Sequence, residues 1–103
     1  MDRFVKVADA DEIKRGEMKL VEVEGQRILL ANVGGQVYAV SEVCPHDVGP
    51  LSEGLLEGEE VECPLHGSRF SVKTGAVLNE PAKTDLTRYS VRIEGYDVLV
   101  GPA

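Results

Sequence analysis

The most chemically informative residues of this chain are its cysteines and histidines, which fall in two short segments. Cys44-Pro45-His46 forms the first segment and Cys63-Pro64-Leu65-His66 forms the second, with residues 47–62 between them. The 103 residues contain no other cysteine or histidine. Thiolate sulfur and imidazole nitrogen together suit zinc or iron, so this pattern predicts a metal site built from two loops.

Three kinds of chemistry are compatible with these residue types. A zinc site with two cysteines and two histidines is possible, although the usual finger keeps its cysteines on one arm and its histidines on the other. Here each segment carries one of each, which fits better a two-iron cluster with both thiolates on one iron and both imidazoles on the other. A cysteine nucleophile beside a histidine needs only one such pair. The two-iron cluster is the preferred interpretation, and zinc and the nucleophile are the alternatives.

Residues 44–75 resemble the Rieske [2Fe–2S] family motif, in which C-x-H is followed, after a spacer, by C-x-x-H. The resemblance implies one [2Fe–2S] cluster whose metal ligands are Cys44, His46, Cys63 and His66. It further implies an all-β fold, a Rieske-type antiparallel β-sandwich with an inserted two-loop cluster-binding subdomain at about residues 42–80 of a single domain, 1–103. Flanking residues also match the family: Gly49-Pro50-Leu51, Gly54, Gly67, Phe70 and Thr74-Gly75.

The resemblance also implies residues that surround the cluster without binding iron. Gly67 and Ser68 follow the second histidine, and Pro81 resembles the proline loop that shields the cluster, although Glu80 stands where the family often has glycine. In respiratory members a tyrosine occupies the position of Phe70, and its hydroxyl and that of the serine donate hydrogen bonds to the cluster sulfurs. Because Phe70 has no hydroxyl, we expect a reduction potential in the low part of the Rieske range of roughly −150 to +300 mV.

The resemblance narrows the function as well. Respiratory Rieske proteins have a membrane anchor and two further cysteines, and oxygenase subunits have further histidines for a second iron; this sequence shows none of these. The chain therefore resembles the small Rieske ferredoxins of ring-hydroxylating dioxygenases, which are one-electron carriers and not enzymes. The implied partners are a flavin- or NAD(P)H-dependent reductase and a terminal oxygenase. The alternative is a small subunit or module of a larger reductase, such as assimilatory nitrite reductase.

Charge and hydropathy limit the partners and the location. Eleven Lys and Arg against eighteen Asp and Glu give a formal charge of −7, which disfavours binding to nucleic acid or to an anionic membrane. The longest apolar run, Ile28–Ala31, is far shorter than the roughly 20 residues that span a bilayer. No apolar signal segment follows Met1, so we expect a cytoplasmic protein, in which a disulfide between the two cysteines is not expected.

Five glutamates lie within residues 53–62, between the two Cys/His segments, and no basic residue lies among them. They predict either a solvated hairpin or a docking face for a basic redox partner. The same region, residues 44–69, is rich in proline and glycine, which favours ordered loops over strands. The five acids are Glu53, Glu57, Glu59, Glu60 and Glu62.

Alternating apolar residues and glycine turns predict β-structure outside that region. Asp9–Arg15 is expected to form one helical turn, and Gly34-Gly35 a tight hairpin. Strands are expected at Phe4–Val7, Met18–Glu24, Arg27–Val33, Gln36–Val43, Phe70–Val72, Ala76–Leu78, Thr87–Glu94 and Tyr96–Val100. The expected core is Val5, Val7, Leu20, Val23, Ile28, Leu30, Val37, Val40, Val91, Ile93, Val98 and Val100.

Overall fold

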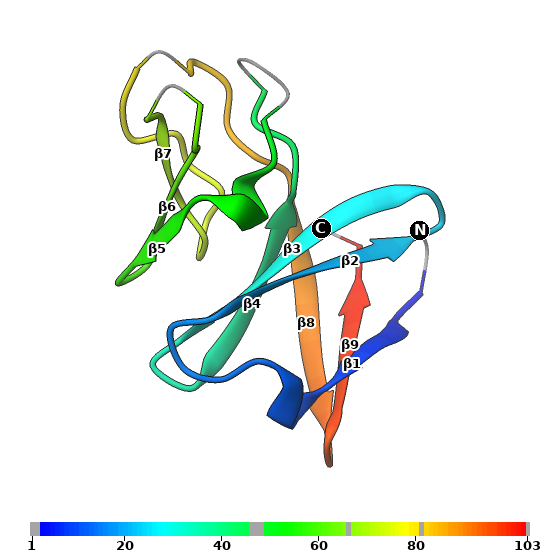
Figure 1. The fold of residues 1–103 in the computed structure, drawn as a ribbon. Helices are drawn as coiled ribbons and strands as arrows, with labels where there is room; N and C mark the ends of the chain where they lie inside the picture. Colours follow the sequence, from blue (N-terminus) through cyan, green and yellow to red (C-terminus); the bar gives the residue numbers. More distant parts are fainter. Residues whose placement is uncertain (1–2, 46–48, 66, 81, 103) are drawn as a thin grey trace.

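The computed structural model describes residues 3–45, 49–65, 67–80 and 82–102, and these residues are nearly all in strands, turns and loops (Figure 1). Two short 3-10 helices, η1 (Ala10–Glu12) and η2 (Leu51–Glu53), interrupt the strands. The strands are β1 (Val5–Asp9), β2 (Met18–Val23), β3 (Gln26–Val33), β4 (Gln36–Ser41), β5 (Leu55–Glu57), β6 (Glu60–Glu62), β7 (Arg69–Ser71), β8 (Arg88–Glu94) and β9 (Asp97–Gly101).

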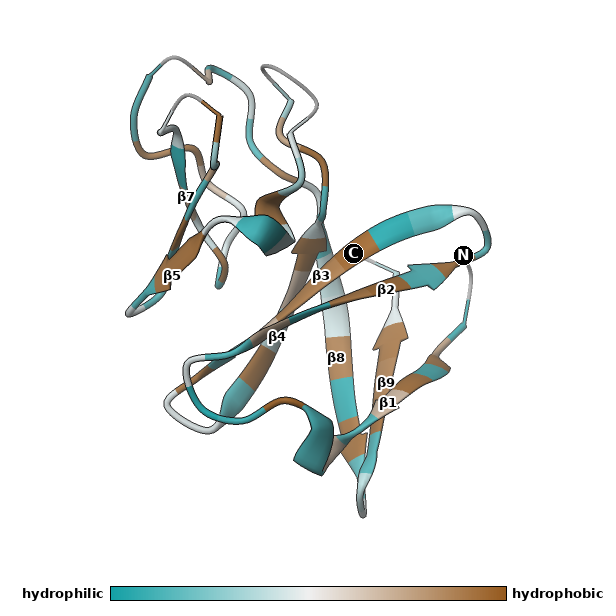
Figure 2. Cartoon of the chain, in the orientation of Figure 1, coloured by the Kyte–Doolittle hydropathy of each residue, from teal (hydrophilic) through white to brown (hydrophobic). Residues whose placement is uncertain are grey.

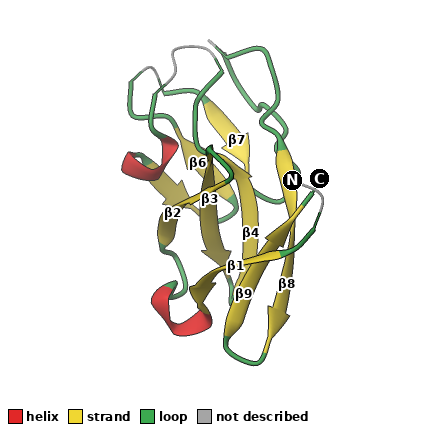
Figure 3. Cartoon of the chain, turned by 90° about the vertical axis from the view of Figure 1, so that its right-hand side faces the viewer, coloured by secondary structure: helices red, strands yellow, loops and turns green. Residues whose placement is uncertain are grey.

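Six of these strands form one antiparallel sheet in the order β1-β9-β8-β4-β3-β2. Its two end strands, β1 and β2, contact each other, so the sheet folds over and its halves face one another (Figures 1 and 3). Apolar side chains from both halves fill the space between them. This inner core consists of Ala8, Ile13, Val23, Ile28, Leu30, Val37, Ala39, Val98 and Val100. The expected antiparallel β-sandwich is confirmed.

Strand β3 is buried on both of its faces. Side chains alternate along a strand, so Ile28 and Leu30 point into the inner core while Leu29 and Ala31 point the opposite way. All four residues are fully buried. The second face of β3 is covered by the chain that follows β4, and hydrophobic residues run along the strands accordingly (Figure 2). Strand β3 therefore joins the sandwich to the part of the chain that carries the cysteines.

That part of the chain contains a second, three-stranded antiparallel sheet in the order β5-β6-β7. Apolar side chains of this region pack against the outer face of β3 and β4. They are Leu51 of η2, Val61 of β6, Phe70 of β7 and Val72, which follows β7. The proline and glycine content of residues 44–69 favoured loops over strands, and β5 and β6 contradict that expectation, whereas they agree with the hairpin that the acidic residues suggested. Each strand is only three residues long, and two of the three residues of β6 are glutamates, so the pairing depends on the packing of residues such as Val61 more than on strand propensity.

The strand expected at Ala76–Leu78 is wrong, because that segment forms only an isolated bridge between Val77 and Phe70. The remaining elements follow the sequence, with differences at the edges of the core. The turn at Gly34-Gly35 has the positive φ angles, 63° and 99°, that a tight hairpin needs. Leu20 and Ile93, expected in the core, are 38% and 50% exposed. Leu20 lies opposite Leu29 in the β2–β3 register, so it shares the outer face, which the small sheet does not fully cover. Val40 is buried on that outer face and not in the inner core.

A close approach at Gly54 fixes the small sheet to the segment before it. A Cβ atom at Gly54 would lie 1.8 Å from the carbonyl oxygen of Glu62, which is backbone and cannot rotate away. We expect Gly54→Ala to lower the free energy of unfolding by about 3 kcal/mol, because Glu62 must shift. Urea unfolding of the purified protein measures the change.

Gly58→Ala is the matched control for this prediction. Gly58 has open space around it and a φ of 61°, so its substitution costs only the strain of the left-handed conformation, about 1 kcal/mol. Equal losses at the two positions would show that the contact between Gly54 and Glu62 does not limit the structure.

Candidate metal centre

The first Cys/His loop leaves the sandwich at the end of β4. The N–H of Cys44 donates to the carbonyl oxygen of Gly49 over 2.9 Å, and Val43 forms a β-bridge with Pro50. The N–H of Leu51 then donates to the carbonyl of Glu42 over 3.0 Å. These contacts close the loop at its base, so the described ends of the loop leave and return at the same place.

The second loop lies between β6 and β7 and is closed in the same way. The N–H of Cys63 donates to the carbonyl of Ser68 over 2.8 Å, and the N–H of Gly67 donates to the carbonyl of Cys63 over 3.1 Å. Gly67 has a φ of 78°, the left-handed conformation that favours glycine. The glycine after the second histidine therefore serves the tight return of the loop.

The two loops thus share one construction. In each, the cysteine N–H donates to the carbonyl of the residue five positions later, so Cys44 pairs with Gly49 and Cys63 with Ser68. The two cysteines are 0% and 1% exposed and belong to the same cluster of buried residues. The described ends of both loops lie at the same end of the molecule, at the top in Figure 1.

This arrangement fits a cluster that needs one thiolate from each loop. The predicted ligands His46 and His66 and the predicted shielding residue Pro81 lie outside the described residues. Within the described part of the chain no three candidate ligand side chains come together, since that part contains neither histidine. The positions of Cys44 and Cys63, and the equal closure of their loops, are therefore what the structure contributes to the site.

Ser68, a predicted neighbour of the site, joins the second loop to the segment that returns toward the sandwich. It is fully buried, and its Oγ accepts a hydrogen bond from the N–H of Ala82 over 3.0 Å. Because a hydroxyl can accept and donate at once, this contact leaves its proton for a second partner. Ser68 therefore holds Ala82, the residue after Pro81, against the second loop.

Phe70, the other predicted neighbour, packs as a core residue. It is fully buried beside Val61 and Val72, and it lies opposite Val61 in the β6–β7 pair. Phe70 belongs to the same cluster of buried residues as Cys44 and Cys63. The apolar layer that holds both cysteines therefore contains an aromatic ring without a hydroxyl.

Glu42 and Ser52 were not identified from the sequence. Glu42 is fully buried, and its two carboxylate oxygens accept hydrogen bonds from Ser52, one from the N–H over 2.9 Å and one from Oγ over 2.7 Å. No ion pair joins Glu42 to any residue in the described ranges. The ten-residue separation gives no periodic signal, so only the folded chain brings the pair together.

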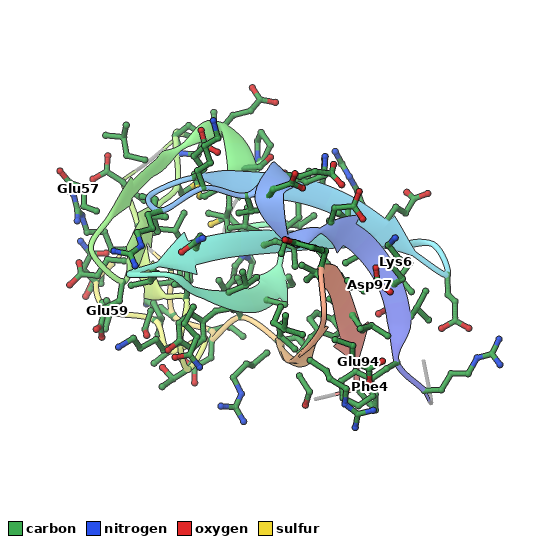
Figure 4. All side chains as sticks on the ribbon, turned by 90° about the horizontal axis from the view of Figure 1, so that it is seen from below. Phe4, Lys6, Glu57, Glu59, Glu94 and Asp97 are labelled. Atoms are coloured by element: carbon green, nitrogen blue, oxygen red, sulfur yellow. The ribbon has the colours of Figure 1, made fainter. Side chains whose placement is uncertain are left out.

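The acidic group between the loops is partly neutralised by cations from later in the chain. Arg69 of β7 reaches across the small sheet to Glu57, Glu60 and Glu62, at 3.3 Å from Glu60 and 3.0 Å from Glu62. Its pKa is raised, chiefly by the hydrogen bond to Glu57. Lys73 pairs with Glu59 at 3.2 Å. Figure 4 places Glu57 and Glu59 at the end of the molecule away from Phe4 and Asp97.

The expected hairpin of acidic residues is therefore present, as β5 and β6 joined at Gly58. Four of its glutamates form ion pairs with Arg69 or Lys73. Each exposed pair contributes little to stability on its own. The network lowers the negative charge that this face presents to a partner.

Comparison with known proteins agrees with this geometry. Residues 3–90 match the Rieske [2Fe–2S] domain family. A curated relative, the ferredoxin component of the naphthalene 1,2-dioxygenase/salicylate 5-hydroxylase systems of Ralstonia sp, is 40% identical over 97 residues, which are 94% of this chain and 93% of the relative.

Solved structures show the same similarity. The ferredoxin of carbazole 1,9a-dioxygenase from Nocardioides aromaticivorans IC177 superposes with a TM-score of 0.93 at 36% identity, covering 99% of this chain and 100% of that one. A complex of reduced oxygenase and oxidised ferredoxin in carbazole 1,9a-dioxygenase contains a chain with a TM-score of 0.91 at 33% identity, covering 95% of this chain and 92% of that one. A structure titled as a nitrite reductase NADPH small subunit superposes with a TM-score of 0.79 at 27% identity, covering 95% of this chain and 97% of that one.

Among the described residues, no helix is long and apolar enough to cross a membrane. The matched family, the paired loops with buried cysteines, and relatives similar over nearly the whole chain lead to one assignment: the protein belongs to the Rieske [2Fe–2S] domain family.

Proposed function

We propose that this protein is the ferredoxin component of a ring-hydroxylating dioxygenase system, a one-electron carrier and not itself an enzyme. It takes one electron from a flavin- or NAD(P)H-dependent reductase and passes it to a terminal oxygenase. The observation that carries the proposal is the pair of buried cysteines at the bases of two equally closed loops. The names of the relatives support it, because they match over nearly their whole length, and a related ferredoxin is titled in complex with its oxygenase.

The proposed cluster ligands are Cys44 and Cys63 for one iron and His46 and His66 for the other. A bound [2Fe–2S] cluster supplies reversible uptake of a single electron. The chain keeps the thiolates in an apolar layer with Leu51 and Phe70, and the closed loops hold them in place. Single-domain organisation, with the cluster-binding subdomain at about residues 42–80, is part of this proposal.

The exposed surface near the loops suggests how partners bind. Leu65, in the second loop, is 56% exposed beside the proposed ligand His66. The ion-paired small sheet lies next to this loop and keeps an excess of acidic residues. We propose that both redox partners present basic residues around an apolar contact, and that the protein acts in the cytoplasm.

The first test combines electron paramagnetic resonance of the dithionite-reduced protein with iron and zinc assays on the same sample. We expect a rhombic Rieske signal and about two irons per chain, since one cluster contains two. Cys63→Ser should lose that iron, whereas Glu53→Gln, an exposed change between the loops, should keep it. One zinc per chain and no signal would refute the electron-carrier function.

Ser68 provides a second test. Ser68→Ala leaves the buried N–H of Ala82 without its acceptor, which we expect to cost about 1–3 kcal/mol of unfolding free energy. If the Ser68 hydroxyl also donates to the cluster, the midpoint potential falls in the same variant. Ser71→Ala is the control, because among the described residues the Ser71 hydroxyl accepts from the N–H groups of Lys73 and Thr74 in the adjacent turn. An unchanged potential would limit Ser68 to holding Ala82.

Substitution of Phe70 tests why we expect a low reduction potential. Phe70→Tyr adds a hydroxyl in the buried layer that holds both cysteines. If the hydroxyl reaches a cysteine sulfur, the midpoint potential rises by about 60 mV, a tenfold change for a one-electron couple. Protein-film voltammetry measures the shift. Phe70→Leu has no hydroxyl and should not raise the potential; an unchanged potential in Phe70→Tyr would remove Phe70 from this explanation.

A further inference from the structure

The buried carboxylate of Glu42 has no role in the function proposed so far. Burying a carboxylate is costly unless its oxygens receive hydrogen bonds. Glu42 is fully buried, and within the described part of the chain its carboxylate has no cation beside it and receives two hydrogen bonds from Ser52, which offset part of the cost of its burial. A residue kept at this cost in a small domain calls for a physical reason.

The position of Glu42 supplies that reason. Glu42 is the residue between β4 and the first loop, and its own N–H donates to the carbonyl of Arg27 over 3.1 Å. Its backbone is therefore tied to the strand side of the sandwich. Its carbonyl accepts from Leu51 and its carboxylate accepts twice from Ser52, so one residue provides three acceptors to two consecutive residues after the loop.

Glu42 thereby caps the start of η2, although it is not the residue that precedes this helix. The residue before η2 is Pro50, which has no side-chain acceptor and makes no capping hydrogen bond. The first amide groups of a helical turn need acceptors, and here Glu42 provides them to Leu51 and Ser52, nine and ten positions later in the chain. The segment on the far side of the first loop is thus fixed to the segment on its near side.

We propose that Glu42 is a positioning residue for the cluster: through Ser52 it holds both ends of the first loop at a fixed separation and so sets the position of the Cys44 thiolate. This inference rests on the proposed function. The contact made by Gly54 extends the same restraint to the second loop, because Gly54 follows η2 directly and abuts Glu62, the residue before Cys63.

The test compares Glu42→Ala, Glu42→Gln and Ser52→Ala in the iron-loaded full chain. Glu42→Ala removes both side-chain acceptors and leaves the half-buried N–H of Ser52 without its carboxylate partner, so we expect about tenfold faster iron release to a ferrous chelator, and altered g-values of the reduced cluster. Ser52→Ala keeps the bond from its N–H and should show a smaller change of the same kind. Glu42→Gln still offers an acceptor to that N–H, so it should restore g-values and release rate close to those of the unmodified protein. Glu53→Ala, an exposed change in the same 3-10 helix, is the matched control.

Each outcome decides the matter. Unmodified g-values and release rate in Glu42→Ala overturn the proposal. If Glu42→Ala does not fold, Ser52→Ala decides it by the same two measurements. Equal potential shifts in Glu42→Gln and Glu42→Ala, with unchanged g-values, also overturn it, because they show an effect of charge and not of position. A signal absent from the unmodified protein refutes the proposed function instead.

Discussion

The hydrogen bond that each cysteine N–H donates across its own loop is the interaction on which the site depends. It brings the residue five positions later back to the cysteine, so the described ends of each loop are held together at its base. The first loop closes on Gly49 and the second on Ser68. The two Cys/His segments differ in sequence and in the spacing of cysteine and histidine, yet the same hydrogen bond closes both loops. A metal centre that takes one thiolate from each loop would therefore bind two cysteines held in the same way.

These loops need a rigid base, and β3 provides it. Because both faces of β3 are buried, the strand cannot shift its register without exposing apolar side chains on one face or the other. The inner core holds β3 in the sandwich through Ile28 and Leu30, and the outer face holds the small sheet through Leu29 and Ala31. The steric contact of Gly54 with Glu62 then connects the two loops at short range. The bases of both loops are therefore held to the sandwich and to each other.

The sequence was most informative where the determinants are local. The Gly34-Gly35 turn and the two strands that it joins involve residues that are close in the chain, and the structure has them where they were expected. It was least informative where distant residues meet. The pairing of Glu42 with Ser52 depends on the closed first loop, and strands β5 and β6 are stable because Val61 packs on the outer face of β3 and β4. Leu20 was misplaced because alternation assigns a face but does not reveal how far the small sheet extends over it.

The acidic residues show the same limit and have a consequence for partner binding. Five glutamates between the loops suggest a strongly negative face when read along the chain, yet Arg69 and Lys73 compensate two of these charges after folding. Surface charges steer association over distances set by the net field, while a fixed ion pair acts only nearby. The steering charge of this end of the molecule is therefore smaller than its sequence suggests, because Arg69, whose guanidinium stays protonated, pairs with three carboxylates there. The small sheet beside the exposed Leu65 thus attracts a basic partner less strongly at long range than five unpaired glutamates would, and the apolar contact at Leu65 gains weight relative to the charges.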